Sequence, residues 1–285
     1  MPFNLSITPA QLEILAKPNQ HLTQTYQLQN NSSSPIFLSA SIQQWQPNST
    51  NQSPQYLPQT NTPVHFSLLN SNIKLNQPFS IPPRQAQQLI LKIQLPNRLP
   101  ESYFTLFLNQ QNPYSTSTNS TQTTAKIGSH LFISTSNTDQ IKHQAKIISF
   151  STTPKIKDIL FSKINLNLDL QNQSNYLFHS NGQLVITKNN HLFQQIPIFP
   201  HRYLAHRSRP IQCFNQQDTH PIPIQCTISP PFWPGLYTVN LELNSNVKIS
   251  PTTASFFVLP ISPLMFIFLI SFLIYLLLKK TKTKT

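Results

Sequence analysis

From Ile164 to Gln171 the sequence reads INLNLDLQ, the most regular alternation of apolar and polar residues in the chain. Isoleucine or leucine holds every first position, and asparagine, aspartate or glutamine holds every second one. Successive side chains of a β-strand point to opposite faces. This pattern therefore predicts a strand with one face in a protein core and the other in water.

Similar period-two segments occur on both sides of this strand. They cover residues 21–30, 36–45, 87–95, 102–109, 123–134 and 145–150 before it, and 182–187, 191–196, 221–228, 235–243 and 253–259 after it. Short strands at this spacing, separated by turns rich in Pro and Asn, indicate β-sandwiches. The polar stretch 134–140 interrupts the series, so we expect a domain boundary near residue 140. The predicted fold class is all-β, with immunoglobulin-like sandwich domains at 1–140 and 141–258.

Composition agrees with this fold class. The chain has 26 Pro and only 3 Gly, so its turns must be built with Pro, Asn and Asp. Pro at this density argues against long helices before residue 259. Residues 47–62 and 109–124 are rich in Asn, Gln, Ser, Thr and Pro and poor in apolar residues, and we expect long loops there.

The C-terminal residues 259–278 read LPISPLMFIFLISFLIYLLL and carry no charge. A helix of this length rises about 30 Å, the thickness of the hydrocarbon core of a bilayer. A buried core helix is the alternative, but apolar residues cover every face and leave no polar stripe. We therefore predict a transmembrane helix from Leu259 to Leu278 in contact with the lipid bilayer. A basic tail at 279–285, beginning with Lys279 and Lys280, should be cytoplasmic.

This orientation predicts a single-pass protein of the cell membrane, with residues 1–258 on the extracytoplasmic side. Export needs a leader, and the start, Met1 to Leu5, has neither a basic nor an apolar segment. A lost leader is the interpretation that keeps the lysines in the cytoplasm. A tail-anchored protein with its bulk in the cytosol is the alternative.

The formal net charge of +13 arises because acidic residues are few. Charged residues make up 9% of the chain, against about 25% in average proteins. A cationic domain is attracted to anionic partners such as wall polymers or lipid headgroups. We predict no nucleic-acid binding, because the sequence has no recognition motif for it and no Lys/Arg run outside the tail.

A basic and aromatic cluster lies between residues 201 and 209. Its members are His201, Arg202, Tyr203, His206, Arg207 and Arg209. Charge and multiple hydrogen-bond donors would let such a cluster hold an anionic polymer or lipid headgroups. A solvated loop between strands, with no ligand, is the alternative.

Cys213 and Cys226 are the only cysteines, and they flank the segment CFNQQDTHPIPIQC. In an exported domain such a pair most simply forms a disulfide. Free thiols are one alternative. A zinc site that adds His201 and His206 is another, although this spacing is not a standard ligand pattern.

Groups for catalysis are scarce. The acidic residues occur singly, and the sequence contains no G-x-S-x-G, H-E-x-x-H or phosphate-binding loop. We therefore expect no enzymatic activity, no cofactor and no metal.

Five segments of the chain together carry a resemblance to a known family. They are SITPAQLEIL and the residues after it (6–45), SIPPRQ to LFL (80–108), KIGSHLFI (126–133), residues 166–186, and WPGLYTVNLEL (233–243). Together they resemble bacterial membrane-anchored surface proteins of the WxL-interacting-protein type. The chain departs from that pattern in its missing leader and its lack of Gly at turns. The resemblance implies a peptidoglycan-binding-like domain, a juxtamembrane sandwich and a C-terminal span. It also implies binding of a cell-wall polymer or another surface protein.

The predicted function is therefore surface binding or adhesion without catalysis. The alternative is a structural spacer or an assembly scaffold, a chaperone-like sandwich with no ligand of its own.

Overall fold

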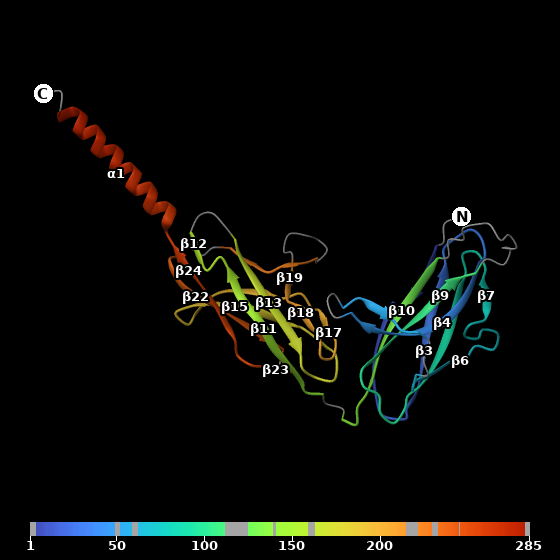
Figure 1. Ribbon diagram of the computed structural model, residues 1–285. Helices are drawn as coiled ribbons and strands as arrows, with labels where there is room; N and C mark the ends of the chain where they lie inside the picture. The colour runs from blue at the N-terminus through green and yellow to red at the C-terminus, as the bar shows by residue number, and fades with distance from the viewer. Residues whose placement is uncertain are drawn as a thin grey trace. The chain divides into compact units, whose positions relative to one another are not determined.

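The computed structural model describes residues 4–48, 52–58, 62–111, 125–138, 141–158, 163–214, 222–229, 233–244 and 246–282, with side chains as far as residue 276. Figure 1 shows β-strands along most of the chain and a helix at its C-terminal end. The chain divides into two compact units, Met1–Gln140 (unit 1) and Ile141–Thr285 (unit 2).

The described residues of unit 1 form two facing sheets. One has the strand order β1-β3-β8-β6, and the other has the order β2-β10-β9-β4-β5, with β7 also paired to β4. These strands are β1 (Leu5–Thr8), β2 (Gln11–Ala16), β3 (His21–Asn30), β4 (Ile36–Pro47), β5 (Pro54–Tyr56), β6 (His65–Leu68), β7 (Pro78–Ile81), β8 (Ala86–Gln94), β9 (Ser102–Gln110) and β10 (Lys126–Thr135).

The core of unit 1 forms from alternate residues of these strands. Tyr26 and Leu28 of β3 and Leu91 of β8 come from one sheet, and Leu106 of β9 and Leu131 of β10 come from the other; all are fully buried. Burying an apolar side chain of this size stabilises the fold by about 1.5–3 kcal/mol. The apolar side chains of the period-two pattern therefore hold the two sheets together, and the same pattern defines the strands.

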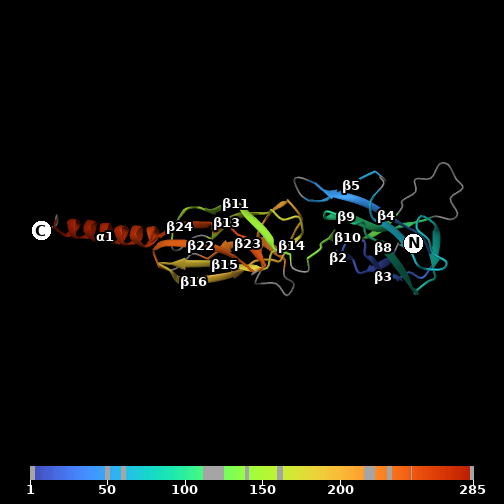
Figure 2. The same ribbon diagram turned by 90° about the horizontal axis from the view of Figure 1, so that it is seen from below.

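The described residues of unit 2 also form two main sheets. One has the order β18-β13-β11-β23 with β21 paired to β13, and the other has the order β12-β24-β22-β15-β16. Figure 2 shows β22, β15 and β16 side by side in the second sheet. These strands are β11 (His143–Thr153), β12 (Ile156–Asp158), β13 (Ile164–Asn172), β15 (Gly182–Lys188), β16 (His191–Pro197), β18 (Ser208–Pro210), β21 (Thr227–Ile228), β22 (Gly235–Leu243), β23 (Val247–Ile249) and β24 (Thr253–Leu259).

Four shorter strands of unit 2 pair outside these sheets. They form the pairs β14 (Phe178–His179) with β17 (Arg202–Tyr203), and β19 (Gln212–Phe214) with β20 (Pro223–Gln225).

The two units share the topology of one sheet, while the other sheets differ in having β6 beside β8 in unit 1 and β23 beside β11 in unit 2. The order β2-β10-β9-β4-β5 corresponds strand by strand to β12-β24-β22-β15-β16. In each unit the first strand changes sheets at a Thr-Pro pair, at Pro9 between β1 and β2 and at Pro154 between β11 and β12. It then pairs in parallel with the last strand, β2 with β10 and β12 with β24. Two mainly antiparallel sheets over one core make each unit an immunoglobulin-like sandwich.

A buried asparagine ties the end of a long strand to a distant turn in each unit. Asn30 of β3 is fully buried, and its Nδ2 donates to the carbonyl oxygen of Ile81 at 3.0 Å. Asn172 of β13 is also fully buried, and its Nδ2 donates to the carbonyl oxygen of Tyr203 at 3.0 Å. In both cases Oδ1 accepts the backbone N–H of the serine two positions later, at 2.9 and 2.8 Å. Both asparagines stand in the sequence Leu-Gln-Asn-x-Ser, so the two units share this contact as well as the topology of one sheet.

The C-terminal helix α1 spans Ile261–Lys282 and directly follows β24. It begins beside β12, where the backbone N–H and the hydroxyl of Ser262 both donate to the carboxylate of Asp158. Its side chains from 264 to 276 are exposed, and most of them are apolar.

This helix corrects the predicted anchor. In the part of the chain that the structure describes, no helix is long and apolar enough to cross a membrane. The predicted transmembrane span and single-pass membrane localisation are therefore wrong. Contact with a lipid bilayer through α1 has no support.

The helix boundaries differ from the prediction as well. Leu259 belongs to β24, and α1 continues past Leu278 through Lys279 and Lys280, so these lysines do not begin a separate tail. A helix rich in Leu, Ile and Phe loses nothing by extending over lysines, because lysine is itself a good helix former.

Two further segments differ from the sequence prediction, and a third lies mostly outside the described residues. Residues 221–228, expected as one strand, contain β20 and β21, with Cys226 between them. Residues 47–62, expected as a loop, contain β5. Of the second expected loop, residues 112–124 lie outside the described residues.

Candidate binding sites

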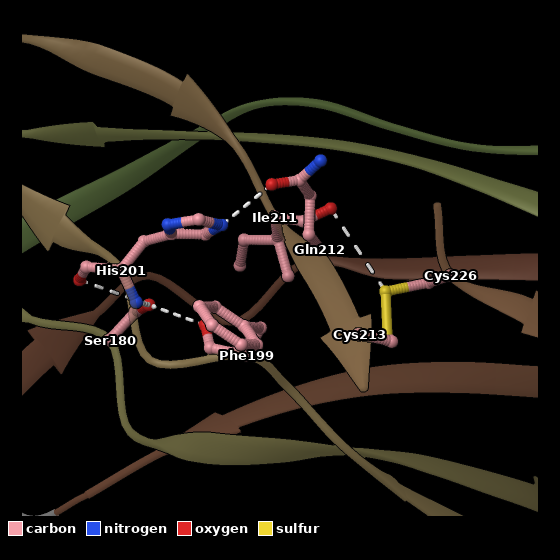
Figure 3. The surroundings of a disulfide bond; sticks show 7 residues. All are labelled: Ser180, Phe199, His201, Ile211, Gln212, Cys213 and Cys226. Atoms are coloured by element: carbon pink, nitrogen blue, oxygen red, sulfur yellow. Dashed lines mark hydrogen bonds between the residues drawn. A yellow bond between two sulfur atoms is a disulfide. The ribbon is translucent and has the colours of Figure 1, made fainter. Parts of the chain in front are cut away.

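The predicted cluster at 201–209 is divided between the core and the surface of unit 2. Tyr203 of β17 is fully buried, and its ring stacks on Phe178 of β14 with 5.3 Å between ring centroids. His201 is also buried, and its Nε2 lies 2.6 Å from Oε1 of Gln212 (Figure 3). Burial raises the pKa of the Tyr203 phenol. Burial, followed by the charge of Arg209, lowers the pKa of His201, which keeps this imidazole neutral at pH 7.

The other members of the cluster lie nearer to solvent. Arg202 is in β17, and Arg209 is in β18; both side chains are half-buried. His206 is exposed in a turn with a left-handed φ of 58°. Arg207 follows it, and its carbonyl oxygen accepts the backbone N–H of Asn172 at 2.8 Å. The segment thus has a structural role through its backbone, and binding of an anionic ligand by its side chains stays a prediction.

A disulfide joins Cys213 of β19 to Cys226, with 4.9 Å between their Cα atoms and both side chains buried (Figure 3). The sulfurs are therefore not available as zinc ligands. Within the described residues, no group of three His, Cys, Asp or Glu side chains is placed to hold a metal ion.

The disulfide hairpin β19–β20 lies at one edge of the unit 2 sandwich. Just before it, the N–H of Ile211 donates to the carbonyl oxygen of Leu168 in β13 at 2.8 Å. On the other side, the N–H of Phe199 donates to the carbonyl oxygen of Gln212 at 2.7 Å, and Ile198 forms a β-bridge with Cys213. This segment therefore connects a strand of one sheet with the end of β16 in the other and closes the edge between them.

The corresponding edge of unit 1 contains a cavity instead. The chain passes from β5 in one sheet to β6 in the other and returns to β7 in the first. A cavity of about 430 Å³ lies beside β4, β6 and β9. Its lining residues include the apolar Ile42, Phe66 and Phe104 and the polar Gln43 and Gln44. The same fold thus has a closed edge in one unit and an open edge in the other.

A row of exposed apolar side chains crosses the outer face of the second sheet of unit 2. Ile156 of β12 lies opposite Phe257 of β24, which lies opposite Leu236 of β22. These three side chains, called the apolar row below, are 59%, 39% and 52% exposed. Trp233, three residues before Leu236, is 67% exposed.

Two exposed lysines lie near β12. Lys155 is exposed, and its carbonyl oxygen accepts the N–H of Phe257 at 2.8 Å. Lys163 is also exposed, and its carbonyl oxygen accepts Nζ of the buried Lys157 at 2.6 Å. Lys155 directly precedes Ile156, so this exposed lysine stands beside the row, whereas Lys163 contacts Lys157, whose buried side chain takes the opposite face of β12 from Ile156.

Sequence reasoning missed both the cavity and the apolar row, although each left a signal. Gln44 occupies an inward-facing position in β4, where the pattern of Leu38, Ala40 and Ile42 calls for an apolar residue. Phe257 and Leu236 are on the outer faces of their strands, where the other residues are mostly polar. The signals are single residues, and only strand pairing shows which of them meet.

No family model matches the chain, and no curated protein matches it. The chain is similar to the class 5 fimbriae chaperone CfaA, with a TM-score of 0.46 and 11% identity over 90% of this chain and 100% of that chain. It is also similar to the E. coli chaperone DraB, with a TM-score of 0.38 and 10% identity over 90% of this chain and 98% of that chain. A third similar structure is PapD-like domain 7 of human CEP192, with a TM-score of 0.29 and 9% identity over 47% of this chain and 87% of that chain. Similarity at this level carries no argument about function. The immunoglobulin-like sandwiches follow from strand pairing, and the resemblance to WxL-interacting proteins stays a prediction.

Proposed function

We propose that this chain is a non-catalytic assembly scaffold that holds a partner protein against the apolar row of unit 2. The row is the observation that carries the proposal. Phe257 and its two neighbours in the sheet stand in register, so their side chains form one contiguous surface. Contiguous exposed apolar surface is uncommon on a monomer and marks interaction sites.

The charges beside the row specify the partner further. Lys155 is exposed directly before Ile156, and the chain carries 20 Lys and Arg but only 7 Asp and Glu. An interface with an apolar centre and a charged rim gains specificity from opposite charge on the partner. The fitting partner is therefore a protein that presents apolar side chains surrounded by carboxylates.

Site-specific photo-crosslinking tests this proposal in cells that express the full chain. p-Benzoylphenylalanine replaces Leu236 in one version and Asn240, an outward-facing residue further along β22, in the control. We expect one discrete heteromeric adduct from position 236 and none from position 240. The substitutions Phe257→Ser and Ile156→Ser should abolish the adduct, and Lys155→Glu should weaken it.

Other results would overturn the proposal. These are equal crosslinking from positions 236 and 240, an adduct that survives Phe257→Ser and Ile156→Ser, or an adduct only between two copies of this chain. Capture of the purified chain by protein-free phospholipid vesicles, lost with the same serine substitutions, would assign the row to a lipid surface instead.

A further inference from the structure

Strand β23 is held at the edge of the first sheet of unit 2 by few contacts (Figure 1). It pairs only with β11, in parallel, and the register joins three residues of each strand, His143–Ala145 and Val247–Ile249. By contrast, β11 pairs with β13 at eight positions. The side chains of Val247 and Ile249 pack against the core but are only half-buried. An edge element with so few contacts opens at a lower free-energy cost than the whole domain.

His143 is the residue of β11 that faces this strand at the end of the core. It lies opposite Val247 in the register, and its backbone N–H donates to the carbonyl oxygen of Asn246 at 3.2 Å. Its side chain takes the same face of β11 as the buried Ala145. The imidazole lies beside the ring of Phe178, with 5.6 Å between the ring centroids. One side of the imidazole therefore packs on the core, and β23 lies next to it.

The Nδ1 atom of this imidazole is buried and, among the described residues, has no hydrogen-bond partner. A neutral imidazole has one N–H donor and one acceptor nitrogen. Because Nδ1 has no acceptor opposite it, the neutral ring carries its proton on Nε2. Protonation would place a charged donor at Nδ1 without a partner, which is costly in a buried position. Burial accordingly lowers the pKa of His143.

The elements around the ring offer the imidazolium no opposite charge. Their titratable groups on β14, β17, β23 and next to His143 are neutral or cationic: Lys142, Lys146, His179, Tyr203 and Lys248. Within the described residues, the only acid on β11 or β13 is Asp169, which takes the outer face of β13 and accepts the hydroxyl of Ser149. A charged His143 can therefore be stabilised only by water.

Water can reach the ring more easily through loss of β23 than through loss of Phe178. The ring of Phe178 is 4% exposed and stacks on the fully buried Tyr203, with 5.3 Å between centroids. The carbonyl oxygen of Tyr203 in turn accepts Nδ2 of the buried Asn172. Moving Phe178 would thus disrupt the core, whereas moving β23 breaks a pairing of three residues.

We propose that His143 and β23 form a pH-sensitive switch, in which β23 is paired with β11 at neutral pH and separates from it when the imidazole is protonated. In the open form the ring is in water, where the pKa of histidine is about 6.5. The open form therefore binds the proton more readily than the closed form, so the closed form is favoured above about pH 6.5 and loses stability as the pH falls below it. The rest of the sheet stays paired, because β11 is held by β13.

Hydrogen exchange of the full chain, read by mass spectrometry at about pH 7 and about pH 5, tests this proposal. Labelling times are scaled so that the pH dependence of intrinsic exchange cancels. The opening of β23 should increase about threefold or more at the lower pH, while peptides from β13 and β22 keep their protection. His143→Phe, which retains an aromatic ring beside Phe178, and His143→Gln should each remove the increase. His191→Gln is the matched control, because His191 is an exposed histidine of β16.

Thermal melts at neutral pH establish that each variant is folded before exchange is compared. Equal protection of β23 at the two pH values would overturn the proposal, as would an increase that persists in both His143 variants. An equal increase in β13, β22 and β23 would show global unfolding instead of a local switch. Phe257→Ser, which disrupts the apolar row, should not affect exchange at β23, because the strands of the row pair with one another and not with β23. The two proposals can therefore fail independently.

Discussion

Replacing Asn172 by alanine should destabilise unit 2 strongly although it removes a single small side chain. Nδ2 of Asn172 donates to the carbonyl oxygens of Tyr176 at 2.8 Å and Tyr203 at 3.0 Å, and Oδ1 accepts from the N–H and the hydroxyl of Ser174 at 2.8 and 2.5 Å. Alanine leaves the Tyr203 carbonyl oxygen buried without this partner. An unsatisfied buried group of this kind costs about 1–3 kcal/mol.

The other lost bonds cost less, because the Tyr176 and Ser174 groups are only partly buried and water can replace the amide. About 1 kcal/mol for these bonds together brings the loss to about 2–4 kcal/mol. The free energy of unfolding of a native protein is about 5–15 kcal/mol, so this loss is a large share of the stability of unit 2. With an m value of about 2 kcal/mol per M, the urea midpoint of unit 2 should fall by about 1–2 M.

Hydrogen exchange at increasing urea, read by mass spectrometry, is the suitable assay because each peptide reports on one unit. Asn167→Ala is the control, since Asn167 lies on the same strand but is exposed, and its Oδ1 accepts from Nε2 of Gln225 at 3.0 Å. We expect it to change stability by no more than about 0.5 kcal/mol. Asn30→Ala should destabilise unit 1 as Asn172→Ala destabilises unit 2. If Asn172→Ala costs no more than Asn167→Ala, the asparagine contact does not hold the fold together.

Three further predictions concern unit 2. Mass spectrometry without reductant should show Cys213 linked to Cys226, and Cys213→Ser with Cys226→Ser should lower its stability by about 3 kcal/mol, as expected for a closed loop of this length; alkylation of both thiols in the native chain would contradict this. Burial lowers the pKa of both His143 and His201, so below about pH 6.5 the unfolded chain binds more protons and unit 2 should lose stability as the pH falls. His143→Gln with His201→Gln should flatten this dependence in urea titrations between pH 7 and 5, and an unchanged slope would show that other groups cause it. Retention on an anionic polysaccharide column should weaken with salt and weaken further when glutamine replaces the arginines of the 201–209 cluster, Arg202, Arg207 and Arg209; unchanged retention would remove the cluster as a binding site.

The bounds of helix α1 could not be predicted from the local hydrophobic pattern alone. The apolar run at 259–278 predicted a helix, and a helix is present, but its first residues belong to β24 and its end lies beyond the lysines. Hydrophobicity changes gradually along such a run, whereas a helix boundary depends on contacts such as that between Ser262 and Asp158, which are 104 positions apart. The membrane span inferred from the same run was wrong.

The sequence by itself determined the fold class and most of the strands. Period two is a local property: the alternation in residues 164–171 reappears as the buried and exposed faces of β13 because adjacent side chains of a strand must point in opposite directions. Pro in abundance and Gly in scarcity excluded long helices in the sandwiches for an equally local reason, the fixed φ and the missing N–H of proline.

Only the tertiary structure decided which strands meet and therefore where the candidate sites are. The pairing of β12 with β24 and of β24 with β22 brings Ile156, Phe257 and Leu236 together, and the cavity needs residues of β4, β6 and β9 at one edge. It also moved His201 and Tyr203 into the core, although their sequence neighbours are basic and polar. The alternation of apolar and polar residues predicts which face of a strand a side chain occupies, but it does not predict which strand lies beside it. The partner is set by hydrogen bonds and packing between segments far apart in the chain.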